Sequence, residues 1–222
     1  QTAKIIRAVL SNRQLYEVMV DFWTNHFNID VKKGLAGPLK VVDDREVIRR
    51  HALGNFKQLL AASAHSPAML VYLDNNENSA RRKVGGIEKI ARNVVIRYLV
   101  GISADAVDAN GDAEGMIGGL NENYGRELLE LHTLGVDGGY GQADVIDVAR
   151  AFTGWTSNPF NGQFSFNKNN HDQEPKRVLG QTVDYGNERD GQAVLDLIAL
   201  HPATARHIAR KLCQRFVSDV PD

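Results

Sequence analysis

The sequence contains a single cysteine, Cys213, among 222 residues. One cysteine cannot form an internal disulfide, and it cannot supply a cysteine-based zinc site. Cys213 lies at helical spacing from Ala209 and Phe216, which predicts a buried structural thiol, because a nucleophilic thiol would need an adjacent base. The chain also lacks any apolar run approaching the length of about 18 residues that a transmembrane helix needs. No segment is therefore predicted to span a bilayer.

The chain has no excess of either charge, since 26 lysines and arginines stand against 27 aspartates and glutamates. Nucleic acids and anionic membranes attract proteins with a basic excess, so nucleic-acid binding is disfavoured. Several catalytic motifs are missing as well: a glycine-rich phosphate loop, a Gly-x-Ser-x-Gly elbow and a His-Glu-x-x-His pair. These absences disfavour nucleotide binding, a serine hydrolase and a helical zinc site.

The length and the composition are those of an ordinary soluble globular protein. With 43% hydrophobic and 24% charged residues, a chain of 222 residues can bury one sizeable core and form at most two small domains. The chain lacks an initiator methionine and a signal-like start, because residues 1–10 already have the pattern of an amphipathic helix. We therefore expect a fragment or a processed form whose targeting information is missing.

Apolar residues recur mostly at helical spacing, which predicts a mainly α-helical fold. We expect an irregular multi-helix bundle, with residues 1–222 forming a single domain or a fragment of one. A less readable insert of loop and helix occupies about residues 74–120. Near residues 163–180, the short alternating pieces around Phe164, Phe166 and Val178 predict a minor β-hairpin or an extended excursion.

Helix-start signals recur along the chain. Residues with a capping oxygen, or a proline at the first helical position, predict where helices begin. Such signals occur at Ser11 with Gln14, Asp43 with Glu46, Asn55, Ser66-Pro67 and His201-Pro202.

The run from Asn121 to Gly135 is the most polar segment that is predicted to be helical. It holds three carboxylates, two side-chain amides, an arginine and a histidine. On an α-helix, Asn123, Glu127 and Glu130 would share one face. Stacked carboxylates repel one another, so a metal ion, an arginine, a shared proton or solvent must neutralise them.

This run supplies the candidate catalytic residues. Glu127 and Glu130 could ligate a divalent metal ion or act as acid–base groups. His132 could be a ligand or a proton carrier, and Arg126 could contact an anion. The alternative is a surface helix whose charges lie in water.

A second polar segment, residues 21–27, contains Asp21 and His26 on an otherwise apolar helix. The functional interpretation places both at one site with the run from Asn121 to Gly135. The candidate metal ligands are then Asp21, His26, Glu127 and Glu130. In the alternative interpretation, Asp21 is solvated and His26 is hydrogen-bonded near the end of its helix.

Taken together, these segments resemble the bacterial family called domain of unknown function 1800. The matching runs follow one another in order over nearly the whole chain. They are Asp21-Phe22-Trp23-x-Asn25-His26-Phe27, Ala52-Leu53-Gly54-Asn55-Phe56, His65-x-Pro67-Ala68-Met69-Leu70-x-Tyr72-Leu73-Asp74, Asn121-Glu122-Asn123-Tyr124, residues 127–140, Phe152-Thr153-Gly154-Trp155 and residues 201–205.

The resemblance implies an exported protein, located in the periplasm or outside the cell, of which this chain is an internal portion. It also implies a partner from the family called domain of unknown function 1501, which is commonly encoded beside it. The resemblance supplies no activity. The leading hypothesis is a metal-assisted hydrolase or lyase that acts on an extracellular substrate. The alternative is a structural or partner-binding module without enzymatic activity.

The chain departs from the family pattern at two glycines in or near the polar run. Gly125 stands where the family usually has alanine, which lowers helix stability by about 1 kcal/mol. Gly141 replaces a usual threonine that could cap the next helix.

Overall fold

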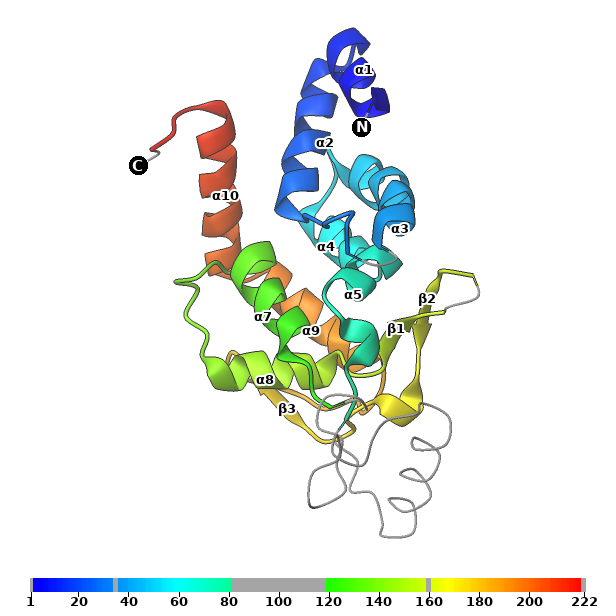
Figure 1. Cartoon of the computed structure of the whole chain (residues 1–222). Coiled ribbons are helices and arrows are strands. Elements are labelled where there is room, and N and C mark those ends of the chain that lie inside the picture. Colours follow the sequence, from blue (N-terminus) through cyan, green and yellow to red (C-terminus); the bar gives the residue numbers. More distant parts are fainter. Residues whose placement is uncertain (1, 34–35, 81–118, 159–160, 221–222) are drawn as a thin grey trace, which may run out of the picture.

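A computed structural model describes residues 2–33, 36–80, 119–158 and 161–220 (Figure 1). Its α-helices are α1 (Thr2–Leu10), α2 (Gln14–His26), α3 (Ala36–Asp43), α4 (Phe56–Ala64), α5 (Pro67–Tyr72), α7 (Glu122–Glu127), α8 (Gln142–Ala151), α9 (Arg189–Ala199) and α10 (Pro202–Phe216). The π-helical segments η1 (Asp44–Arg49) and η4 (Leu128–Thr133) continue α3 and α7, and the short 3₁₀ turns are η2 (Asn75–Glu77) and η5 (Lys168–Asn170). The mainly α-helical prediction is confirmed.

The β-structure of the described residues consists of two small antiparallel hairpins. The first pairs β1 (Trp155–Ser157) with β2 (Phe164–Phe166), and the second pairs β3 (Lys176–Val178) with β4 (Gln181–Val183). These hairpins confirm the minor β element that was expected near residues 163–180. Most of the insert predicted at about 74–120 lies outside the described residues.

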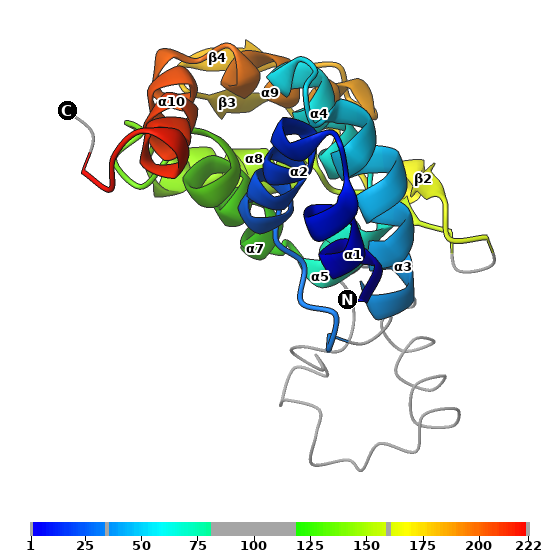
Figure 2. The ribbon, with the colours of Figure 1, turned by 90° about the horizontal axis from the view of Figure 1, so that it is seen from above.

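Helices α2 and α10 run beside one another toward the end of the molecule where both termini lie (Figure 1). Seen from above, α2 lies between α10 on one side and α3 on the other (Figure 2). The α7–η4 helix contacts α8, and η4 also contacts α10. Segments from the start, the middle and the end of the chain therefore meet around the C-terminal end of α2.

The apolar faces of the helices converge on one core. Trp23 donates its indole N–H to the carbonyl of Ala52 at 3.0 Å, and its ring packs against Phe27 and Phe56. Deeper in the core, the ring centroids of Trp155 and Phe152 lie 4.8 Å apart. Burial of an apolar side chain of this size stabilises the fold by about 1.5–3 kcal/mol. In contrast to its predicted burial, Cys213 is half-exposed on α10.

Most of the predicted helix starts are confirmed. The Asn55 side chain accepts the backbone N–H of Lys57 at 2.9 Å, and His201 accepts that of Ala203 at 3.2 Å. Asp43 directly precedes η1 but does not cap it, because its backbone is already helical at the end of α3 and its side chain makes no capping hydrogen bond. Its buried carboxylate accepts a hydrogen bond from Ser66 at 2.8 Å and pairs with Lys40 at 3.2 Å.

A buried ionic network joins the second hairpin to α9. The carboxylate of Asp190 accepts hydrogen bonds from Lys176 at 2.7 Å and from His171 at 3.1 Å, and all three side chains are fully buried. Although desolvation raises the pKa of Asp190, hydrogen bonds from Lys176, the backbone N–H of Tyr185 and His171 lower it overall. Full burial leaves this network no access to a substrate, so its role is structural.

Candidate functional site

A cavity of about 510 Å³ lies between the end of α2, the α7–η4 helix and α10. We call it the large cavity. Its polar lining includes Asn25, His26, Lys33, Glu127, His132 and Lys211. The structure therefore brings together three of the predicted site residues, His26, Glu127 and His132, which come from two distant segments of the chain.

The π-helical register of η4 explains why Glu127 and His132 share this cavity. On an α-helix, residues five apart point about 140° away from each other. A π-helical turn, closed by a hydrogen bond between residues five apart, is wider than an α-helical turn, so the angle between side chains at this spacing becomes smaller. Within η4, the backbone N–H of Leu134 bonds to the carbonyl of Leu129 at 2.8 Å, a five-residue step. Asn123 and Glu127 line the large cavity, whereas Glu130, whose charge raises the pKa of Glu127, does not.

Glu127 is a half-buried carboxylate without a hydrogen bond or ion pair among the described residues. Desolvation and then the nearby charge of Glu130 raise its pKa, which Arg126 partly lowers. The guanidinium of Arg126 binds Glu122 at 3.2 Å and Gln142 at 2.9 Å. Arg126 is therefore held by side chains outside the large cavity, and it is not among the residues that line it.

The hydrogen bonds of His26 fix its protonation. Its Nε2 lies 3.0 Å from the carbonyl oxygen of His132, and its Nδ1 lies 2.9 Å from Nζ of Lys211. A carbonyl only accepts, so Nε2 carries the proton and Nδ1 accepts from the ammonium of Lys211. Desolvation, followed by the charge of Lys211, holds the pKa of His26 well below its usual value. His26 is thus a neutral ring with both nitrogens engaged.

Two more imidazoles adjoin His26. The ring centroids of His132 and His207 each lie 6.2 Å from that of His26. Desolvation, and then the charge of Lys211, lowers the pKa of His132 to about 4. Burial and Lys211 also lower the pKa of His207. His207 packs closely over Gly135, where a Cβ atom would lie 2.7 Å from Nδ1 of the imidazole.

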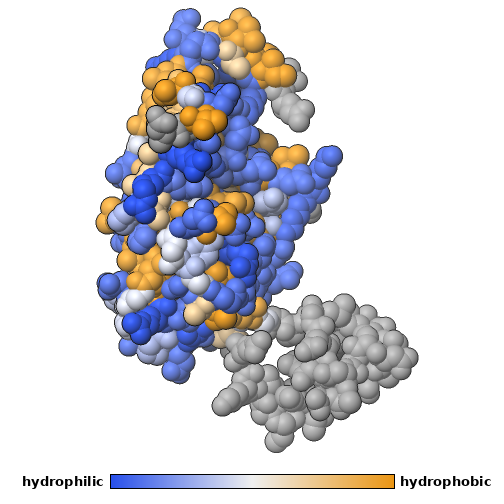
Figure 3. Space-filling view, turned by 90° about the vertical axis from the view of Figure 1, so that its left-hand side faces the viewer, coloured by the Kyte–Doolittle hydropathy of each residue, from blue (hydrophilic) through white to orange (hydrophobic). Residues whose placement is uncertain are grey.

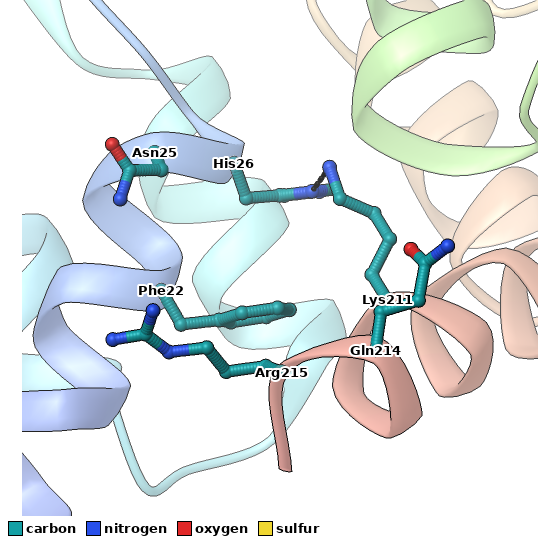
Figure 4. A pocket seen from close by; sticks show the side chains of 6 residues that line it. All are labelled: Phe22, Asn25, His26, Lys211, Gln214 and Arg215. Atoms are coloured by element: carbon teal, nitrogen blue, oxygen red, sulfur yellow. Dashed lines mark hydrogen bonds between the residues drawn. The ribbon is translucent and has the colours of Figure 1, made fainter. Parts of the chain in front are cut away.

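Lys211 was not predicted as a site residue, and neither was His207. Both lie on α10, four residues apart, and this spacing was the only signal in the sequence. Lys211 is half-buried, and desolvation lowers its pKa. It also lines a smaller pocket of about 290 Å³ between α2 and α10. Figure 4 shows Lys211 reaching from α10 to His26, with Asn25, Gln214 and Arg215 around this small pocket.

Asp21 lies apart from this group. Its carboxylate pairs with Lys4 at 2.8 Å and with Arg215 at 3.2 Å, and it lines neither the large cavity nor the small pocket. Among the residues that the structure describes, no group of three or more histidines, cysteines and carboxylates is placed to hold a metal ion. A metal ion bound by Asp21, His26, Glu127 and Glu130 stays a prediction.

Comparison with known proteins gives one match. A family model described as "Protein of unknown function (DUF1800)" matches residues 1–222. The searches of curated proteins and of solved structures find no match. Within the described part of the chain, no helix combines the length and the apolar character needed to cross a membrane.

Proposed function

We propose that this chain, which belongs to the DUF1800 family, is an enzyme with acid–base chemistry in the large cavity. One observation carries the proposal: Glu127, at the end of α7, and His132, on the π-helical segment η4, line the same cavity. Both groups have displaced pKa values, raised for Glu127 and lowered for His132. Displaced pKa values on groups that line one cavity are typical of catalytic sites.

The reaction class that fits this pair is hydrolysis or elimination. At neutral pH, the neutral imidazole of His132 can accept a proton from a water molecule or from a substrate carbon. The protonated fraction of Glu127, which the raised pKa increases, can donate a proton to the leaving group. His26 acts neither as the proton acceptor nor as the proton donor, because both of its ring nitrogens are hydrogen-bonded. Its function is to position Lys211.

The proposal includes the location and the partner that the family resemblance implies. We place the substrate outside the cytoplasm and propose a member of the DUF1501 family as the partner. In a metal-assisted form of the reaction, a divalent ion would use Glu127, the carboxylate on the wall of the large cavity. Elemental analysis of the purified protein tests this form independently of activity.

The proposal is tested by exchanging Glu127 for glutamine. The chain would be assayed against chromogenic esters, phosphodiesters and glycosides and against uronate polymers, with and without added Mg²⁺, Mn²⁺ or Zn²⁺. We expect Glu127→Gln to lower the turnover of any accepted substrate by about 100-fold or more. The matched control is Glu46→Gln, an exposed glutamate on the π-helical segment η1 that lies outside both pockets.

Two outcomes would overturn the proposal. The first is equal turnover by the Glu127→Gln and Glu46→Gln proteins. The second is the absence of turnover on every substrate class, both with and without metal. Thermal unfolding of both variants shows whether a loss of activity reflects a loss of folding.

A partner-binding module is the second candidate, and the exposed apolar side chains of α1 favour it. Ile5, Val9 and Leu10 are 64%, 70% and 73% exposed. Figure 3 shows hydrophobic residues gathered at the top of the molecule, where α1 and the C-terminal end of α10 lie. Exposed apolar patches often mark protein interfaces. If Val9→Asp abolishes co-purification with the neighbouring gene's product while Glu127→Gln changes nothing, this second function is supported.

A further inference from the structure

The lining of the large cavity includes Lys211, a positive charge without a counter-ion among the described residues. Lys211 forms no ion pair with a carboxylate among the described residues, although it is half-buried. Other described lysines that are not fully exposed each pair with an acid: Lys33 with Asp74, Lys40 with Asp43, Lys57 with Asp196 and Lys176 with Asp190. An ammonium that is withdrawn from water without a partner is costly. Lys211 thus differs from the rest.

The immediate neighbours of Lys211 are imidazoles. His26, His132 and His207 surround it, and Lys211 lowers the pKa of each. We call these three histidines and Lys211 the basic cluster. Among the residues that line the large cavity, Glu127 is the acidic one. The pKa of Lys211 is lowered by desolvation, without an opposing shift from a carboxylate. The field in this part of the cavity is therefore positive.

The geometry of Lys211 leaves it donors for a ligand. An ammonium has three N–H donors, and among the described residues only one is used, toward Nδ1 of His26. Since Nε2 of His26 is held by the carbonyl of His132, the ring cannot turn without losing that bond. The ammonium is thus fixed in place between the large cavity and the small pocket, both of which it lines (Figure 4).

We infer that Lys211 binds an oxyanion, and that the substrate of the proposed reaction carries a carboxylate, sulfate or phosphate group. The anionic group would accept the two remaining N–H donors of Lys211, in a cavity that Glu127 also lines. An anionic group held at Lys211 would keep the rest of the substrate in the cavity that Glu127 and His132 also line. That the anion is part of a substrate rests on the proposed function. The binding of an anion by Lys211 does not depend on that function.

The experiment follows the imidazole signals of His26 and His132 by NMR while the full chain is titrated with sulfate, phosphate or acetate. Acetamide, which is the neutral analogue of acetate, controls for effects that do not depend on charge. We expect saturable shifts with the anions and none with acetamide. Lys211→Met should weaken anion binding by about tenfold or more, because a charge-assisted hydrogen bond is lost. Lys211→Arg should retain binding, and so should the surface control Lys57→Met.

The outcomes separate this inference from the proposed function. If Glu127→Gln abolishes turnover but still binds sulfate as tightly as the wild type, both hold. Equal responses of the wild-type and Lys211→Met proteins to every anion would overturn the inference, whatever the activity. So would a linear response without saturation, or equal shifts with acetate and acetamide. If Lys211→Met does not fold, Lys211→Gln is measured instead. Anion binding by Lys211→Gln that is as strong as that of the wild type would also overturn the inference.

Discussion

One hydrogen bond, between Lys211 and His26, joins α10 to the C-terminal end of α2. It holds an ammonium against a neutral imidazole, which is stable only while that ring stays unprotonated. The sequence predicted His26 and His132 as candidates because they stand in polar segments. It could not predict Lys211, since a lysine on an amphipathic helix is ordinary and its meaning comes from the lack of a carboxylate nearby. Residue types in the sequence indicate which side chains could take part in catalysis. Only the structure shows that a charged side chain such as Lys211 has no carboxylate partner among the described residues.

The displaced pKa of His132 predicts a pH-dependent stability. A histidine in the unfolded chain titrates near pH 6.5, and the folded state lowers this value to about 4. The unfolded state thus binds more protons in between, so stability is full above about pH 6.5 and falls as the pH drops toward 4, by up to roughly 3 kcal/mol. Urea unfolding at several pH values measures this change in the free energy of unfolding. His132→Gln should remove the share of His132 and leave the shares of His26 and His207, whose pKa values are also lowered; an unchanged slope would show that His132 contributes none of it.

At the scale of elements, the change from α7 to η4 decides which side chains meet. Helix starts were predictable where a local side chain caps the backbone, as at Asn55, or where proline begins the helix, as at Pro202. No separate helix starts at Asp43, because α3 runs directly into η1 there and the backbone of Asp43 is already helical. The π-helical register was not predictable either, because sequence patterns assume a period of 3.6 residues. Glu130, which was predicted to share a face with Glu127, lies near it but does not line the large cavity.

The family usually has alanine at the position of Gly125 and threonine at that of Gly141. We expect Gly125→Ala to destabilise the fold and Gly141→Thr to stabilise it. A Cβ atom at Gly125 would lie 2.9 Å from the backbone oxygen of Val145, where α8 crosses α7. Gly125→Ala gains about 1 kcal/mol of helix propensity but forces this crossing apart, which costs about 1–3 kcal/mol, so we expect a net loss. Gly141→Thr meets open space and adds a cap, which should stabilise the fold by a few tenths of a kcal/mol.

Thermal and urea unfolding of the two glycine variants measure this difference. Greater stability of Gly125→Ala than of the wild type would contradict the close approach of α7 and α8.

At the scale of the whole molecule, the site exists only because distant segments pack together. His26 and Lys211 are 185 residues apart, and His26 and His132 are 106 apart. The sequence predicted a mainly helical fold with a minor hairpin, since helical periodicity and capping are local. It could not predict which helices would enclose a cavity, because that depends on how their apolar faces pack. The same packing buries the network around Asp190, none of whose three members lines the large cavity.

That network predicts a large effect on stability. Lys176→Met leaves the fully buried carboxylate of Asp190 without its ammonium partner, which costs about 3–5 kcal/mol. The matched control is Lys168→Met, on the exposed turn η5, which should change stability by less than about 0.5 kcal/mol. Urea unfolding at neutral pH compares the two. Equal stability of both variants would show that Lys176 is not the counter-ion of Asp190.

The most direct test of the central claim is an NMR titration that follows the side-chain carboxyl of Glu127 and the imidazole of His132 in one sample. The claim is that the π-helical register sets both groups on the partly dehydrated wall of one cavity. It predicts that the pKa of Glu127 lies above 4.5 and that of His132 near 4. A pKa of Glu127 at or below 4.5, together with a pKa of His132 near 6.5, would place both groups in water and contradict the account.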